Sequence, residues 1–337
     1  MTVLAASLGR FAYALLTCIC ALAIYPVNAS GQAPDRIARL GFVEPGSGAE
    51  PVRGYTGAGF WQRLEELGWK PDKNLIVEHR WANGDNRRFP ELIADVLARQ
   101  VDVLVVFTTP AALAAKHATS TVPIVAATMG DPIGTGIASD LARPGGNLTG
   151  LSQGWDEGIA GKWLDLAQEV APRATSVAAL GNPDNPLVRT ALRNLASFAG
   201  QRKLKLRMIE VRDAAAIDAA FGTAAREAQA VIVVPDALTV QHRKRIVALA
   251  NKHRVPAVYG LLDFADVGGL LAFGVDQVVL FRRAADYVDK ILRGARPGDL
   301  PIEQATKYSL IVNLKAADAA GIRVPQGLLL RADEVLR

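Results

Sequence analysis

The sequence predicts an α/β protein of two doubly wound parallel-sheet lobes, with a hinge and an interlobe cleft. Three observations lead to this fold class. Short runs of Val, Leu and Ile alternate with amphipathic helical patterns along the chain, an order typical of parallel sheets covered by helices. The 337 residues, 50% of them hydrophobic, are enough for two cores. The alternation also restarts after residue 150, as expected for a second lobe.

The first series of elements is organised around the apolar run 101–109. Five of its first seven residues are Val or Leu, a composition that suits a strand buried on both faces of a sheet. Pro110 fits the first position of a helix, so Thr109 is the predicted N-cap. The expected strands are 37–43, 75–78, 101–107, 123–127 and 147–150, and the expected helices are 57–67, 87–99 and 110–116; Thr108 and Thr109 end the third strand.

The second series has the same character and ends in an Ala-rich helix. Its expected helices are 155–170, 187–199, 214–228, 240–253, 278–292 and 314–320, and its strands are 176–180, 204–211, 230–234, 256–259, 269–273 and 308–312. Crossovers near Gly150, Gly274 and residues 300–307 divide the chain into two lobes. The N-terminal lobe is predicted to be 35–150 plus 274–300, and the C-terminal lobe 151–273 plus 301–337.

The N-terminal segment is interpreted as a cleaved signal peptide, residues 1–29. Arg10 gives it a positive charge, the apolar stretch 11–25 is too short for a comfortable membrane span, and Val27-Asn28-Ala29 has the small-residue spacing of a cleavage site. A retained N-terminal anchor is the alternative. Both cysteines lie inside the segment, so a cleaved chain would have no disulfide. The expected location is the periplasm.

Charge and motifs argue against several function classes. The net charge is +5, basic and acidic residues are interspersed along the chain, and the sequence has no nucleic-acid-binding motif. No nucleic-acid partner is therefore expected. The four histidines lack zinc spacing, and neither a Gly-x-Ser-x-Gly elbow nor a P-loop is present. We therefore expect the protein to bind no metal and no cofactor and not to be an enzyme. The alternatives are a periplasmic hydrolase using Asp131 and Asp236, and a ligand-sensing receptor domain.

Polar residues follow several predicted strands and are the candidate ligand-binding residues. Ligands of doubly wound sheets bind outside the carboxyl ends of the strands. The candidates at these ends are Ser47, Thr108, Thr109, Asp131, Asn182, Asn185 and Asp236. Each also has a structural interpretation, because hydroxyls, carboxylates and amides cap helices and form turns.

The same positions indicate a ligand chemistry. The N-terminus of helix 110–116 has unsatisfied donors and partial positive charge, which suit a carboxylate, while Asp131 or Asp236 suits an ammonium group. Aromatic side chains for an apolar tail would come from Phe107, Trp155, Tyr259 and Phe273. A zwitterion with an apolar tail is an amino acid.

Several runs together resemble the ABC-transporter substrate-binding family that includes bacterial tryptophan- and tyrosine-binding lipoproteins, over residues 35–337. They are Thr109–Lys116, Gly130–Gly134, Arg143–Gly150, Asn182–Pro186, Gly268–Gly274, Asn313–Lys315 and Arg331–Val335. The resemblance implies a type 1 periplasmic binding fold with three crossing strands and one small amphipathic solute. It also implies ABC permease and ATPase subunits encoded elsewhere.

The chain departs from its relatives at positions that could line the cleft. They are the segment 260–264, Phe273 where a tyrosine is frequent, and Trp155 where smaller residues are usual. The exact ligand is therefore not carried over. We expect a monomeric, periplasmic solute-binding component of an ABC importer, for an amino acid, aromatic or branched, or a related carboxylate.

Overall fold

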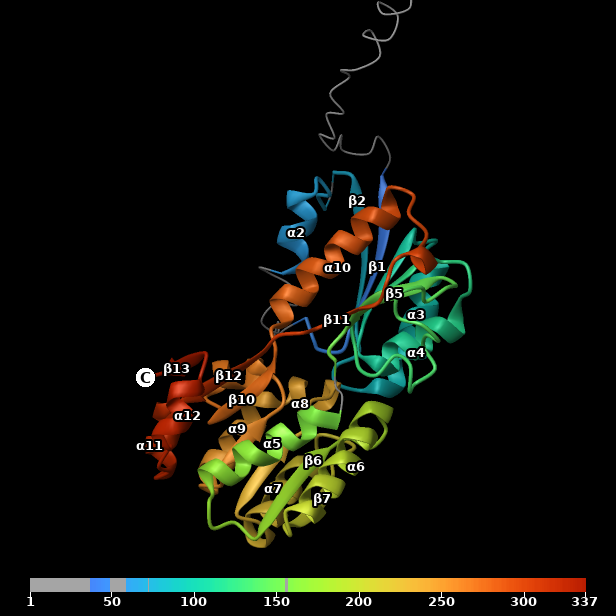
Figure 1. Ribbon diagram of the computed structural model, residues 1–337. Coiled ribbons are helices and arrows are strands. Elements are labelled where there is room, and N and C mark those ends of the chain that lie inside the picture. The colour runs from blue at the N-terminus through green and yellow to red at the C-terminus, as the bar shows by residue number, and fades with distance from the viewer. Residues whose placement is uncertain (1–36, 49–58, 72, 155–156) are drawn as a thin grey trace, which may run out of the picture. The chain divides into compact units, whose positions relative to one another are not determined.

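The computed structural model describes residues 37–48, 59–71, 73–154 and 157–337 (Figure 1). Residues 34–337 belong to one compact unit. The predicted signal peptide and Trp155 lie outside the described residues. The described strands form a six-stranded and a seven-stranded sheet, each with helices on both faces, and the predicted fold class is confirmed.

The first sheet is parallel throughout and has the strand order β11-β5-β4-β3-β1-β2. Its strands are β1 Ala38–Glu44, β2 Leu75–Trp81, β3 Val103–Phe107, β4 Ile124–Met129, β5 Leu148–Ser152 and β11 Glu303–Gln304. One face packs against α2 Phe60–Glu66 and α10 Gln277–Leu292, and the other against α3 Phe89–Ala98 and α4 Thr109–Ala118 (Figure 1). A 3₁₀ turn, η1 Asn86–Arg88, precedes α3.

The second sheet has the order β13-β12-β10-β9-β8-β6-β7 and is parallel except for the antiparallel pair β10 and β12. Its strands are β6 Ser176–Gly181, β7 Lys205–Glu210, β8 Ala230–Val233, β9 Ala257–Tyr259, β10 Leu271–Val275, β12 Tyr308–Asn313 and β13 Glu334–Leu336. One face packs against α5 Glu157–Val170, α6 Pro186–Gln201, α11 Leu314–Ala320 and α12 Gln326–Arg331. The other packs against α7 Ala216–Glu227, α8 Ala237–Gln241 and α9 Arg243–Lys252.

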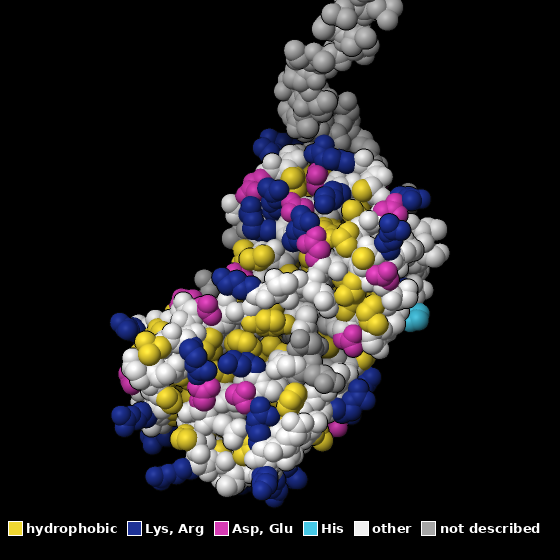
Figure 2. Space-filling model, viewed as in Figure 1, with side chains coloured by type: hydrophobic (Ala, Val, Ile, Leu, Met, Phe, Trp, Pro, Cys, Tyr) yellow, Lys and Arg dark blue, Asp and Glu magenta, His cyan; other side chains and the backbone are white. Residues whose placement is uncertain are grey.

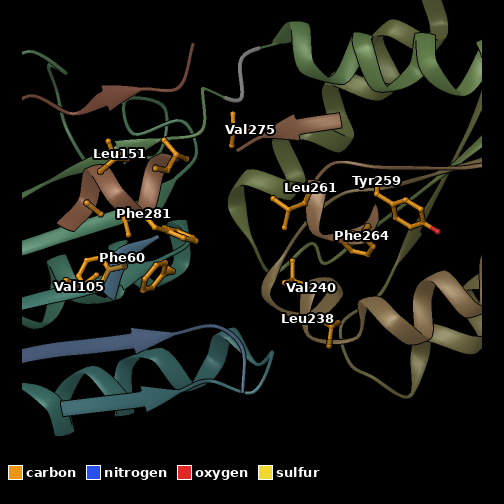
Figure 3. Packing of buried hydrophobic residues seen from close by; sticks show 14 of the residues in the cluster. Phe60, Val105, Leu151, Leu238, Val240, Tyr259, Leu261, Phe264, Val275 and Phe281 are labelled. Carbon is orange, nitrogen blue, oxygen red and sulfur yellow. The ribbon is translucent and has the colours of Figure 1, made fainter. Parts of the chain in front are cut away.

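Buried aromatic rings hold α10 on the first sheet. Phe107, at the end of β3, packs edge-on against Phe42 of β1 at 5.0 Å and against Phe281 of α10 at 5.1 Å. All five residues of β3 are buried, which explains why its sequence has no polar alternation. The same apolar cluster continues into the second sheet through residues such as Leu261 and Phe264 (Figure 3).

The chain passes between the two sheets after β5, after β10 and between β11 and β12. The predicted boundary at residue 300 differs from the structure here, because β11 pairs with β5 of the first sheet. A strand of only Glu303 and Gln304 has no apolar run by which the sequence could reveal it. Its position is fixed by Arg283 of α10, whose guanidinium donates to both carboxylate oxygens of Glu303 at 2.8 and 2.6 Å. The division of the whole chain into lobes stays a prediction.

The helix predicted over 240–253 is two helices in the structure. Asp236 caps α8 in a capping box with Thr239, and α9 begins one residue after His242. The short elements α12 and β13 were not predicted. Among the described helices, none has the length and apolar character needed to cross a bilayer. On the face shown in Figure 2, basic and acidic side chains are intermixed.

Candidate functional site

A narrow cavity lies where strands of both sheets end, and it is lined from both sides. The first sheet and its loops contribute Pro45, Thr108, Thr109, Thr128, Met129, Gly130 and Gln153. The second contributes Asn185, Leu187, Pro235, Asp236, Ala237, Val240 and Leu261. The space open to the centre of a water-sized sphere is about 40 Å³. That is room for about three waters, since each needs roughly 10–15 Å³ by this measure.

Thr108 has an unusual backbone conformation at the wall of this cavity. Its φ of 77° and ψ of 153° lie in a region that costs a β-branched residue conformational energy. The prediction of Thr109 as the N-cap is wrong, because α4 begins at Thr109 and Thr108 is the N-cap residue. The Thr108 side chain makes no capping bond, and its buried Oγ1 has no hydrogen-bond partner among the described residues. The strain therefore places an unused hydroxyl at the cavity.

Thr109 also lines the cavity, but its hydroxyl has a structural partner. The backbone N–H of Gly130 donates to Thr109 Oγ1 at 2.9 Å, which ties the end of β4 to the start of α4. Gly130 in turn lies against Leu187 of α6. A Cβ on Gly130 would be 2.1 Å from Leu187 Cδ2, so the two sheets approach this closely only because residue 130 is glycine.

Asp236 is the centre of a hydrogen-bonded cluster that includes both predicted asparagines. Asn182 Nδ2 and the N–H of Leu238 donate to Asp236 Oδ1 at 3.2 and 3.1 Å. Asn185 Nδ2 and Asn86 Nδ2 each donate to Oδ2 at 2.9 Å. A carboxylate has about four acceptor sites, and neutral donors occupy all of them here. Asp236 is 5% exposed, and its acceptor capacity is already used.

Two polar contacts join the sides of the cavity. Asn86, on the first side, donates to Asp236 on the second, and Gln241 Nε2 of α8 donates to Ser47 Oγ at 3.2 Å. Ser47, a predicted site residue, lies beside the cavity without lining it. Asn86 was not predicted, because in the sequence it follows Gly84-Asp85 and has the character of a turn residue.

Asp131 has the structural role that the sequence left open. Its Oδ1 accepts a hydrogen bond from the N–H of Gly134 at 2.8 Å, as in a turn, and its side chain does not line the cavity. Asp131 and Asp236 therefore do not share the cavity as an acid–base pair. This removes the geometric basis of the hydrolase alternative.

The two predicted aromatic site residues also lie elsewhere. Tyr259 is fully buried, stacks on Phe264 at 4.7 Å, and points its hydroxyl away from Leu261 and Val240 of the cavity wall (Figure 3). Burial raises the pKa of the Tyr259 hydroxyl. Tyr259 is the last residue of a strand, and strand residues alternate between faces, so its position alone could not tell which way it pointed.

Phe273 stacks on Tyr308 at 5.7 Å, next to the crossing segments, and does not line the cavity. The Tyr308 hydroxyl donates to the carbonyl oxygens of Gln153 and Gly154 at 2.8 and 2.5 Å. These contacts make Phe273 part of the joint between the sheets. Phe107, expected near the ligand, is in the core.

The described residues contain no group of three or more His, Cys, Asp or Glu side chains that could hold a metal ion. The cavity presents hydroxyls, side-chain amides, the start of α4 and apolar walls.

Comparison with known proteins identifies the family. The family model described as ABC transporter substrate binding protein matches residues 49–336. The chain belongs to this family. Substrate-binding proteins of ABC transporters bind a small solute outside the cytoplasmic membrane for a permease and its ATPase, and the family is one of binding proteins rather than enzymes.

Individual relatives of this substrate-binding protein are distant in sequence. A curated relative, the tyrosine-binding protein of Clostridioides difficile strain R20291, is 23% identical over 279 residues, which are 82% of this chain and 80% of the relative. A conserved domain protein of Vibrio cholerae O1 has a TM-score of 0.81 at 25% identity, over 89% of this chain and 100% of its own. The ABC domain of Streptococcus pneumoniae, solved in complex with L-Trp, has a TM-score of 0.78 at 24% identity, over 89% of this chain and 99% of its own.

Proposed function

We propose that this substrate-binding protein captures an amino acid with an aromatic or branched side chain and delivers it to an ABC importer. The observation that carries the proposal is the buried hydroxyl of Thr108, which has no hydrogen-bond partner in the described ranges and lies at the wall of a cavity between two sheets. Unpartnered buried polar groups are rare in native proteins, and strained residues cluster at ligand sites.

The ligand's carboxylate would lie at Thr108 and the start of α4. A helix N-terminus presents backbone donors and partial positive charge, so it favours an anion. Thr108 Oγ1 can donate a hydrogen bond to the same group. Thr109 supports this corner through its bond to Gly130.

The ligand would enter an open form of the protein. Sites for small molecules typically have about 300–1,000 Å³, far more than the narrow cavity of about 40 Å³ described here. Opening requires the Asn86–Asp236 and Gln241–Ser47 contacts to break, and these are two partly buried hydrogen bonds worth about 0.5–1.5 kcal/mol each. A hinge motion of this kind is well known for two-lobed binding proteins.

The names of two relatives support the class of ligand. One is a tyrosine-binding protein, and the other was solved with L-Trp. Both ligands are zwitterions with an aromatic side chain. The departure in segment 260–264, which includes the cavity-lining Leu261, would accommodate a different side chain.

Binding is tested by thermal unfolding of the mature protein against the twenty amino acids, followed by titration calorimetry. A ligand at a hundred times its dissociation constant should stabilise the fold by about 2.7 kcal/mol. Each bound compound is then checked for turnover, which a binding protein should not show. If no amino acid shifts the melting temperature while other small solutes do, the proposed ligand class is wrong.

We further propose that the mature protein begins at Ser30 and acts as a periplasmic monomer. The apolar segment 11–25 and the Val27-Asn28-Ala29 site support cleavage. N-terminal sequencing of the exported protein should give Ser30 first, and light scattering should give the mass of one chain. An intact Met1 chain in the membrane fraction would contradict the first, and a dimer mass the second.

A further inference from the structure

Two buried carboxylates lie at strand ends beside the cavity, and they differ in their partners. Asp236 accepts four hydrogen bonds from neutral donors. Glu44, the last residue of β1, is 4% exposed, and its Oε1 has no partner among the described residues. Glu44 was not among the residues predicted from the sequence.

The second oxygen of Glu44 is little better satisfied. It lies 3.6 Å from His79 Nε2, a distance that allows an ion pair if the imidazole is protonated but is too long for a hydrogen bond, and that nitrogen has no hydrogen-bond partner in the described part of the chain. Leaving a buried carboxylate without a donor costs more than a neutral group would. A donor from outside the chain would remove this cost.

Glu44 lies on the strand next to the proposed carboxylate site. β1 pairs with β3 in parallel register up to Val43 and Val106, and neighbouring strands are about 4.8 Å apart. Thr108 follows β3 directly, and Pro45, which follows Glu44, lines the cavity. The ammonium and carboxylate of an amino acid are attached to one carbon, so their partners must come from adjacent elements, as these do.

Aromatic rings flank Glu44 on its other side. Trp81 is its register partner on β2, and the Trp81 and His79 rings are stacked with centroids 4.0 Å apart. The face of a tryptophan ring attracts cations, and its edge and face also pack well against an apolar side chain. Gly48 lies against the indole, where an added Cβ would be 3.2 Å from the ring.

We propose that Glu44, rather than Asp236, receives the protonated amine of the ligand, and so selects amino acids over the corresponding acids that lack the amine. This inference rests on the proposed function. Asp236 then has a different role, which is to hold Asn86, Asn182 and Asn185 in place when the two sides of the cavity meet.

The test uses Glu44→Gln, which keeps the shape of the side chain and removes its charge. The probes are three pairs of compounds that differ by the amine: L-tryptophan and indolepropionate, L-tyrosine and hydroxyphenylpropionate, and L-leucine and isocaproate. A lost charge-assisted bond should raise the dissociation constant of the amino acid about 10- to 100-fold. The dissociation constant of the deaminated partner should be the same for the variant and the wild type.

Glu78→Gln is the matched control. Glu78 lies on β2, on the strand beside β1, and already has Arg39 as a partner at 2.9 Å. This substitution should leave the affinity for all six compounds unchanged. Glu44→Asp, which keeps the charge on a shorter side chain, serves as the second variant if Glu44→Gln does not fold by circular dichroism, and it should retain part of the preference for the amine.

The outcomes separate this inference from the proposed function. If the wild type binds an amino acid and Glu44→Gln binds it equally well, the inference is overturned while the function stands. An equal loss for both members of a pair gives Glu44 a purely structural role and also overturns it. If the wild type binds no amino acid with an aromatic or branched side chain, or prefers the deaminated acids, both the inference and the proposed ligand class are overturned.

Discussion

Gly130→Ala should act as a wedge between the two sides of the cavity. The new Cβ would be 2.1 Å from Leu187 Cδ2, 2.4 Å from Cδ1 and 2.6 Å from Cγ. Ordinary contacts begin near 3.4 Å, so the nearest pair is about 1.3 Å too close. Rotating the leucine methyls would not clear Cγ, and the two sides must therefore separate.

The free-energy cost of this steric clash falls on the closed form alone. Overpacking by one methyl typically costs about 1–3 kcal/mol, and 1.4 kcal/mol is a factor of ten in an equilibrium constant. If the ligand is held by the closed form, the apparent dissociation constant should rise about 5- to 150-fold. Unfolding of the ligand-free protein should change little, because the open form avoids the clash.

The assays are titration calorimetry with the identified amino acid and small-angle scattering with and without it. Gly130→Ala should show weaker binding and a larger radius of gyration at the same ligand concentration. In a Leu187→Ala background the same substitution should have little effect, which is a double-mutant test of the contact. Gly200→Ala, in α6 with open space around its Cβ position, is the control. Wild-type affinity and compaction in Gly130→Ala would refute the reasoning.

Two further predictions follow from strain and charge. Thr108→Gly should raise the free energy of unfolding by about 0–2 kcal/mol, because relief of the strained backbone exceeds the entropy cost of glycine. It should also weaken ligand binding about 10-fold or more, and a urea titration beside calorimetry would show both; a loss of stability would contradict the strain argument. The Arg283 guanidinium donates to the Glu303 carboxylate and lowers the pKa of that carboxyl below its usual value of 4.5. The ion pair therefore stabilises the fold fully at a pH above 4.5, and this stabilisation is lost as the pH falls through the lowered pKa. Urea unfolding should therefore show a smaller loss of stability on acidification for Glu303→Gln than for the wild type, and equal losses would count against the pair.

The fold was predictable from the sequence where an element can be recognised from its own residues alone. The apolar run that became β3 and the amphipathic stretch that became α10 are examples, and α10 differs from its prediction by one residue. β11 was missed because a pair of polar residues becomes a strand only through its partners β5 and Arg283. The same limit applies to β13, which forms by pairing with β12.

The candidate site was only partly predictable, for a related reason. Position at a strand end indicates which residues can reach a cavity, and Thr108, Thr109, Asn185 and Asp236 do line it, while their part in ligand binding stays a prediction. It could not tell that the acceptor capacity of Asp236 is used by three asparagines and a backbone N–H, nor that Glu44 Oε1 has no hydrogen-bond donor among the residues that the structure describes. Whether a polar group is satisfied depends on residues far away in the chain. The unpartnered group was therefore visible only in the structure.

The position of α10 determines the order in which the first sheet can be completed during synthesis. β1 and β3 leave the ribosome early, but Phe281, which packs against Phe107 in the finished protein, follows Phe107 by about 170 residues. At common rates of translation that interval is roughly 10–35 s. During this time α2 is the native cover available on this face of the sheet, and the part that α10 covers stays exposed. The first sheet can therefore reach its final packing only after the strands of the second sheet up to β10 have been made.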